Sequence, residues 1–106
     1  MQNKMNNKSR EYSKKQERLA RYSKALSHPA RVFILDFIAG NKSRSCYSGD
    51  IAKELTIARS TLSQHLTELK SAGLIYGEND PPFIRYCIND EAWEEARKMY
   101  KSFLSR

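Results

Sequence analysis

Apolar residues recur at helical spacing in the N-terminal part of the chain. From Glu11 to Leu26 there is no Gly or Pro, and Tyr12, Leu19, Tyr22 and Leu26 follow one another at intervals of seven, three and four. This spacing predicts an amphipathic helix with a narrow apolar stripe. A second helix is predicted to begin at Pro29, because proline suits the first helical position, where an N–H has no partner.

The second helix should run to Ala39 and end at Gly40. Its sequence RVFILDFIA is apolar on most faces, which is typical of a helix at the centre of a small bundle. The segment Cys46-Tyr47-Ser48 predicts a short strand at a sheet edge. Gly49-Asp50 supply an N-cap for a third helix over Ile51 to Leu55.

A fourth helix is predicted to begin near Arg59 and to stop at Gly73. Three leucines share one side of it: Leu62, Leu66 and Leu69. The residues on the other side are polar and uncharged: Ser60, Gln64, Thr67 and Ser71. One side of this helix should therefore pack, while the other is exposed.

Two strands and a last helix complete the pattern. The strands are predicted over Leu74 to Glu78 and Phe83 to Ile88, joined by a loop over Asn79 to Pro82. Asn89-Asp90 cap the last helix, whose acidic residues come first and whose basic residues come last, the order that suits the helix dipole. Its apolar residues are spaced by three, four and three: Trp93, Ala96, Tyr100 and Phe103.

This order of elements is that of a winged helix-turn-helix. We expect a mainly α fold with a small β-wing, built from five helices and a two- to three-stranded antiparallel sheet. In this architecture the second helix of the motif enters the DNA major groove. The predicted organisation is a basic, flexible N-terminal tail over residues 1–10, followed by a DNA-binding and dimerisation domain over residues 11–106.

Length and charge narrow the class of protein. The 106 residues fit one domain. Of the formal net charge of +7, residues 1–28 supply a surplus of six, from eight Lys and Arg against two Glu. A basic flank favours a polyanionic partner, either nucleic acid or an anionic membrane, although a solvated tail that aids solubility has the same composition.

The sequence contains no apolar run of the roughly 20 residues that a membrane span needs, and no apolar stretch of a secretory signal. We therefore expect a cytoplasmic protein without a membrane partner. The chain has two cysteines, Cys46 and Cys87, and two histidines, His28 and His65. These are too few for a four-ligand zinc module within one chain, and we expect neither an obligatory cofactor nor an enzyme.

Three segments resemble a known family. LSHPARVFILDFIAG, GDIAKELTIARSTLSQHLTELKSAGLI and IRYCIND followed by a terminal helix are similar to the ArsR/SmtB repressors, small homodimeric sensors of metals and metalloids. The resemblance covers residues 24–104. It implies a winged-helix homodimer, paired through its first and last helices, that represses by binding operator DNA and releases it when an inducer binds.

The early turns of the fourth helix are the candidate DNA contacts. They comprise Arg59, Ser60, Thr61, Ser63, Gln64 and His65. Glutamine can bond an adenine edge through two hydrogen bonds, and serine and threonine suit several bases or phosphates. His65 is either a phosphate contact or a partly packed structural histidine, and His28 is interpreted as a helix-entry residue. Arg85 and the Asn79 to Pro82 tip form the predicted wing, placed for backbone or minor-groove contact, unless the prolines only make a rigid turn.

The sensing site departs from the family's patterns. Its arsenic sensors with Cys-Val-Cys ahead of Asp-Leu would need cysteines at Tyr47 and Gly49, and its zinc sensors place histidines on the last helix, where residues 90–106 have none. Cys46 and Cys87 remain, expected on neighbouring strands and close enough to share one soft ion or to oxidise together. The predicted inducer is a trivalent arsenical, with thiol oxidation as the alternative. In a third interpretation both cysteines are small, partly buried residues without a function.

The dimer interface is predicted from the aromatic residues of the first and last helices. It comprises Tyr12, Leu19, Tyr22, Trp93, Ala96, Tyr100 and Phe103. Their apolar surface is large for so small a domain, so burial against a second copy should stabilise both chains. A winged-helix module that binds protein instead of DNA, with the fourth helix as an ordinary surface, is the rival interpretation.

Overall fold

The structure is a computed structural model that describes residues 11–41 and 45–106, so the predicted tail over residues 1–10 lies outside the described residues. Its elements follow the predicted order: α1 (Lys14–Ala25), α2 (Pro29–Ala39), β1 (Ser45–Tyr47), α3 (Ser48–Glu54), α4 (Arg59–Ser71), β2 (Ile75–Asp80), β3 (Phe83–Ile88) and α5 (Asp90–Leu104). Over the described residues, five helices and a three-stranded antiparallel sheet confirm the winged helix-turn-helix.

The first two helices begin at side-chain caps. Ser13 caps α1 in a capping box with Gln16, so the helix begins three residues after the predicted Glu11. His28 caps α2, where its Nδ1 accepts from the backbone N–H of Ala30 at 3.0 Å. This confirms His28 as a helix-entry residue, and α2 ends at Ala39 as predicted.

The helix-turn-helix pair comes next in the chain. Helix α3 begins at Ser48, with Tyr47 at the N-cap position and its backbone N–H donating to Asp50 Oδ2 at 3.2 Å. Gly49-Asp50 therefore lie inside the helix, which corrects the predicted start at Ile51. Helix α4 begins at Arg59, as predicted, and Gly73 follows its end with a φ of +84°, a left-handed conformation that glycine adopts without strain.

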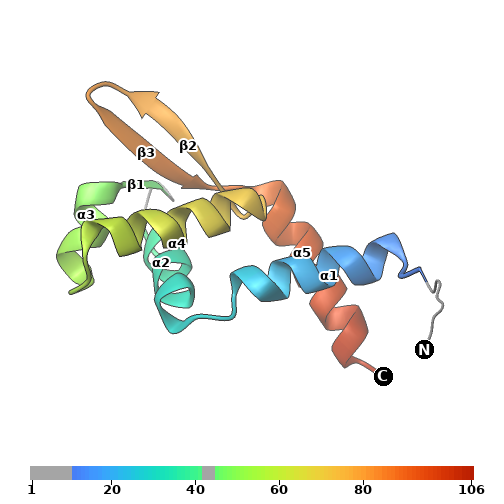
Figure 1. The fold of residues 1–106 in the computed structure, drawn as a ribbon. Helices are drawn as coiled ribbons and strands as arrows, with labels where there is room; N and C mark the ends of the chain where they lie inside the picture. The colour runs from blue at the N-terminus through green and yellow to red at the C-terminus, as the bar shows by residue number, and fades with distance from the viewer. Residues whose placement is uncertain (1–10, 42–44) are drawn as a thin grey trace.

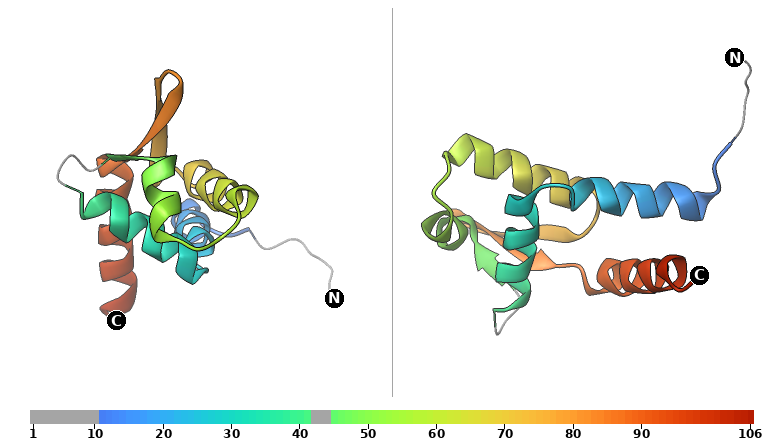
Figure 2. Two further views of the ribbon diagram at one scale, coloured as in Figure 1. Left: turned by 90° about the vertical axis from the view of Figure 1, so that its left-hand side faces the viewer. Right: turned by 90° about the horizontal axis from the view of Figure 1, so that it is seen from below.

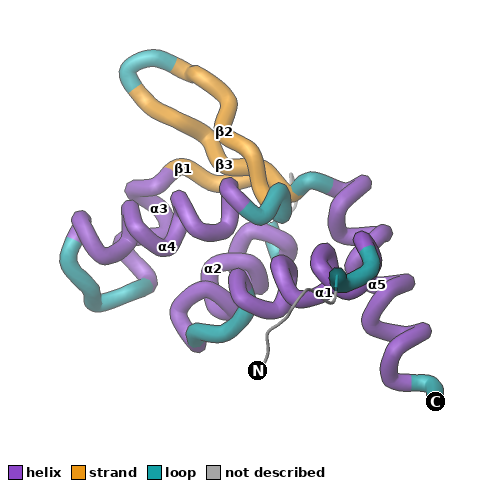
Figure 3. The backbone as a smooth tube through the Cα atoms, turned by 45° about the vertical axis from the view of Figure 1, so that its right-hand side comes forward, coloured by secondary structure: helices purple, strands orange, loops and turns teal. Residues whose placement is uncertain are grey.

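The sheet has the strand order β1-β3-β2 (Figure 3). Strand β2 continues to Asp80, two residues past its predicted end, because Asn79 and Asp80 pair with Ile84 and Phe83. The turn is thus reduced to the Pro81-Pro82 pair, whose peptide bond is cis. The β2–β3 hairpin projects beyond α3 and α4, as a wing does (Figures 1 and 3).

The hydrophobic core contains residues from both the helices and the sheet. Its most deeply buried large residues come from α2, α3, α4 and β2: Ile34, Ile38, Ile51, Leu69 and Ile75. Helix α2 supplies Ile34 and Ile38 to this core, but Val32 and Phe33 are 48% and 38% exposed, so the helix is less enclosed than its sequence predicts. Helices α1 and α5 pack on each other at the end of the molecule away from α3 and the wing (Figures 1 and 2).

Candidate nucleic-acid interface

The outer face of α4 is exposed and polar. Its leucine stripe is buried, with Leu62, Leu66 and Leu69 between 0% and 4% exposed. The predicted DNA contacts Arg59, Ser60, Ser63 and Gln64 are exposed, and Thr61 is half-buried. Because the leucines fix the rotation of the helix, these polar side chains share one outward surface, which continues to Thr67.

His65 does not belong to that outward surface. Its side chain is 7% exposed, its Nδ1 lies 3.1 Å from Arg31 Nη1, and its ring centroid lies 4.5 Å from that of His28. Of the two roles considered for His65, the structure favours the packed histidine, and this corrects its assignment to the DNA contacts. Burial, followed by the charges of His28 and Arg31, holds the pKa of His65 below its ordinary value.

The wing arginine already has a partner. Arg85 on β3 stands opposite Glu78 on β2, and its Nη2 donates to Glu78 Oε1. The Glu78 carboxylate raises the pKa of Arg85 further, so the guanidinium keeps its charge. A contact from Arg85 to DNA stays a prediction, and it requires a phosphate to replace Glu78.

Part of the basic flank acts inside the fold. Arg18 Nη2 lies 2.6 Å from Glu95 Oε1 on α5, and Lys24 Nζ lies 3.7 Å from Glu68 Oε2 on α4. Arg21 Nη2 donates to the Ser71 carbonyl oxygen at 2.9 Å. These three cations were part of the basic flank predicted to bind a polyanion, but they hold α1 against α5 and α4. Lys14 and Lys15 are exposed at the start of α1.

Sequence reasoning missed Arg31. Its Nε donates to the Ala25 carbonyl oxygen at 2.7 Å, and it also borders the outer face of α4 beside Ser63 and Gln64. The sequence did contain a signal for this second polar side of α4. Three polar residues follow one another at intervals of three, and in the structure they contact basic side chains of α1 and α2: His65, Glu68 and Ser71.

The two cysteines lie on neighbouring strands, as predicted, but they do not face each other. In the β1–β3 register Cys46 is opposite Tyr86 and Cys87 is opposite Ser45. Because side chains alternate along a strand, this offset of one residue sends the two thiols to opposite faces of the sheet. The expected direct pair is therefore wrong.

Both thiols are also shielded. Cys46 is 2% exposed in the core, where its Sγ accepts from Asn41 Nδ2 at 3.0 Å, and Cys87 is 7% exposed. Burial is the largest cause that raises the pKa of each thiol, so both stay protonated at neutral pH. Among residues 11–41 and 45–106 no three His, Cys, Asp or Glu side chains gather as metal ligands.

The predicted dimer residues divide into two groups. Tyr22 and Ala96 are buried within the chain. The Tyr22 hydroxyl donates to Glu95 Oε1 at 2.5 Å, so Tyr22 joins α1 to α5 and is not free for a partner. Tyr12 and Phe103 are 68% and 48% exposed. Leu19 is half-buried, and Leu104, which the sequence reasoning left out, is 74% exposed.

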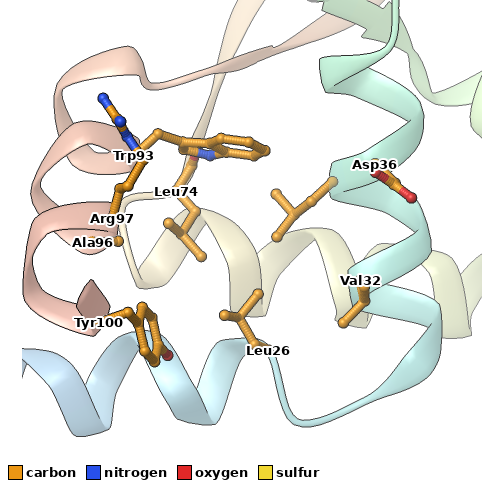
Figure 4. Close-up of a pocket in the computed structure, with 9 residues that line it drawn as sticks. Leu26, Val32, Asp36, Leu74, Trp93, Ala96, Arg97 and Tyr100 are labelled. Atoms are coloured by element: carbon orange, nitrogen blue, oxygen red, sulfur yellow. The ribbon is translucent and has the colours of Figure 1, made fainter. Parts of the chain in front are cut away.

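An apolar hollow of about 290 Å³ lies between α2 and α5 (Figure 4). Its wall contains three predicted dimer residues, Trp93, Ala96 and Tyr100. Trp93 Nε1 donates to the Leu74 carbonyl oxygen at 3.2 Å and the Tyr100 hydroxyl is hydrogen-bonded to Ser23 Oγ at 2.7 Å. With their polar atoms paired inside the chain, both rings contribute apolar surface to the hollow.

Known proteins are similar to this chain in sequence. Residues 28–76 match the family model described as "Bacterial regulatory protein, arsR family". The chain is 36% identical over 76 residues to the HTH-type transcriptional regulator YgaV of Escherichia coli, covering 72% of this chain and 75% of that protein. It is 31% identical over 83 residues to the transcriptional repressor SdpR of Bacillus subtilis, covering 78% and 89%.

Solved structures show the same architecture. An ArsR-like transcriptional regulator from Rhodococcus superposes with a TM-score of 0.71 at 22% identity, over 83% of this chain and 80% of that one. HlyU from Vibrio cholerae superposes with a TM-score of 0.69 at 21% identity, over 89% and 100%.

The family match and the relatives, which are transcriptional regulators and not enzymes, define the class of this protein as a DNA-binding transcriptional regulator. The chain belongs to the ArsR family of bacterial regulatory proteins. In the part of the chain that the structure describes, every helix is too short or too polar to span a membrane.

Proposed function

We propose that this protein is a homodimeric repressor that reads operator DNA with the outer face of α4. The observation that carries the proposal is the α4 surface itself, where uncharged hydrogen-bonding side chains point outward from a helix fixed by buried leucines. Such side chains can bond base edges in the major groove, and exposed cations add affinity through phosphates. A repressor of this kind works where the operator lies, in the cytoplasm.

Selection from a random-sequence duplex library tests this function. The dimeric protein should enrich two half-sites in inverted repeat, because the symmetry of the protein is mirrored in the DNA. Affinity for the enriched duplex should fall steeply as salt rises. A winged-helix module that binds protein instead would enrich no sequence.

The homodimer is proposed from the hollow and from exposed apolar residues on α2 and α5. Phe103 and Leu104 extend the apolar side of α5, and Val32, which is 48% exposed, lines the hollow on α2. A second copy placed in a two-fold arrangement buries each contact twice, which strengthens the association. Tyr12 on the N-terminal side of α1 is the remaining exposed aromatic of the predicted set.

Phe103→Glu is expected to weaken dimerisation at least a hundredfold. Burial of one Phe side chain contributes about 1.5–3 kcal/mol, and the two-fold axis doubles it, while tenfold in affinity corresponds to about 1.4 kcal/mol. Analytical ultracentrifugation measures the shift. Ser102→Glu is the matched control, because residue 102 is exposed on the opposite side of α5. A Phe103→Glu protein that sediments like the wild type contradicts this interface.

The inducer is proposed to bind Cys46 and Cys87 and, in doing so, to separate strand β1 from strand β3. One trivalent arsenic atom binds two thiolates only when they lie on the same side, and the register places them on opposite faces. The inducer thus favours a state in which β1 has moved. Because α3 follows β1 directly, with Ser48 next to Tyr47, that movement displaces the helix-turn-helix.

Cys46→Ser and Cys87→Ser are each expected to abolish release of the selected duplex by arsenite or by a methylated trivalent arsenical. Both variants should bind the duplex as the wild type does, since neither thiol lies on the α4 surface. Fluorescence anisotropy of labelled duplex measures release, and peroxide in place of the arsenical tests the redox alternative. Normal arsenical release by both variants places the inducer elsewhere.

A further inference from the structure

Helix α4 is held to the rest of the fold by a polar seam on the side next to its DNA-facing surface. The seam consists of three side chains of α4, His65, Glu68 and Ser71, and the basic residues that contact them. Arg21 and Lys24 of α1 bind Ser71 and Glu68, and Arg31 of α2 binds His65. Because α1 is part of the proposed dimer interface, the seam links the interface to the recognition helix.

Arg31 is the junction of this seam. Its guanidinium donates to the carbonyl oxygens of Ala25 at 2.7 Å and Lys24 at 3.3 Å, at the C-terminal end of α1, where carbonyl groups lack helical partners. Its third contact is His65 Nδ1 at 3.1 Å. One half-buried side chain thus joins the end of α1 to the middle of α4.

The contact specifies one protonation state. An arginine side chain can only donate hydrogen bonds, so His65 Nδ1 must accept and carry no proton. A second positive charge on the His65 ring would face Arg31 from α2 and the His28 ring before it, while the nearby Lys24 ammonium from α1 is paired with Glu68. Protonation of His65 therefore opposes the seam.

We propose that Arg31 is a positioning residue for operator recognition, which holds α4 in its reading position through neutral His65, so that acidification releases the operator. The inference rests on the proposed reading of DNA by α4. It assigns His65 a role opposite to a phosphate contact. If His65 contacted a phosphate, its protonation would strengthen DNA binding. If His65 anchors α4 to Arg31, its protonation weakens DNA binding.

The direction of the pH effect follows from the packed environment. Packing lowers the pKa of His65 below its ordinary 6.5, so the anchored state holds fewer protons than a state in which the histidine is free. The anchored state is therefore fully favoured above about pH 6.5 and loses ground as the pH falls through the lowered pKa. Between pH 6.5 and that lowered pKa, each pH unit costs a factor of at most about ten, and below the lowered pKa the loss stops because the histidine is protonated in both states.

The test measures affinity for the selected duplex and for a random duplex from about pH 7.5 to about pH 5.5, with the full chain. Wild-type affinity for the selected duplex should fall over this range, by at most about tenfold. His65→Gln should bind normally at neutral pH and lose the acid effect, because its Oε1 accepts from Arg31 but does not titrate. His28→Asn keeps the helix cap and should retain most of the acid effect.

The Arg31→Met variant tests whether Arg31 positions α4 or binds a DNA phosphate. At neutral pH it should weaken binding of the selected duplex about tenfold, with random-duplex affinity and salt slope unchanged, because the donors of Arg31 serve protein carbonyls and His65. Arg31→Lys, which keeps one charged donor, should restore part of the loss. Circular dichroism at the assay temperature verifies that each variant is folded, and its melting temperature reports stability separately.

The outcomes distinguish the two proposals. If the wild type selects a duplex but its affinity is constant or rises on acidification, the positioning role is overturned and the proposed function stands. An acid effect that persists in His65→Gln also overturns it. If the wild type selects no duplex at any pH, the proposed function fails, and this inference with it.

Discussion

Gln64→Glu is expected to weaken binding to the selected duplex at least a hundredfold while the fold is unchanged. The side chain is exposed in the middle of the outer face of α4, so the substitution disturbs no packing. It replaces an amide that can donate and accept with a carboxylate that faces the phosphates. Like charges brought together in an interface cost several kcal/mol, and each 1.4 kcal/mol or so is tenfold in affinity.

Two variants control for the added charge. Ser102→Glu adds the same charge at the other end of the molecule, far from α4, and should bind within about twofold of the wild type (Figure 1). Gln64→Ala removes the amide without adding charge and should lose less than Gln64→Glu. Anisotropy titrations at one salt concentration compare all three. Equal losses for Gln64→Glu and Ser102→Glu would mean that only net charge matters.

Leu69→Ala is expected to lower the free energy of unfolding by about 3 kcal/mol. Leu69 is 0% exposed, where the α4 stripe meets the rest of the core. Removal of its buried carbons leaves a cavity in the close-packed interior, and the total stability of such a domain is only about 5–15 kcal/mol. The recognition helix would lose its main anchor as well.

Urea denaturation at one fixed protein concentration measures this change as a shift of the midpoint at constant slope. Thr67→Ala is the control on the same helix, because its side chain is exposed and its loss should cost less than about 0.5 kcal/mol. A Leu69→Ala midpoint equal to that of the wild type would show that α4 does not depend on this contact.

Local patterns in the sequence predicted most of the fold. The period of the leucines fixed the buried side of α4, and Pro29 and Gly40 marked the ends of α2. The boundary errors have two causes. The starts of α1 and α3 are set by local caps that were not recognised, at Ser13 and Tyr47, and the end of β2 depends on a partner elsewhere in the chain. Strand β2 runs to Asp80 because β3 offers it hydrogen-bond partners, and no residue inside β2 records that pairing.

The candidate site also has features that the sequence predicted and features that it could not predict. The exposure of Ser63 and Gln64 follows from the helical period, so the sequence predicted it. Strand adjacency placed Cys46 near Cys87, but the register that separates their faces depends on how β1 meets β3. The contact of Arg31 with His65 joins residues 34 positions apart. The polar residues three apart on α4 can be seen in the sequence, but the sequence does not say which basic residue each of them contacts.

The measurement that bears most directly on operator reading by α4 is a second selection from the random duplex library with Gln64→Ala. We expect the wild-type preference to relax at one base position in each half-site while the other positions and the half-site spacing are retained. A bidentate glutamine contact provides about 1–3 kcal/mol of base discrimination, so the relaxation should be about fivefold or more at that position. If Gln64→Ala selects the same bases with the same strength as the wild type, α4 does not read the operator through its outer face.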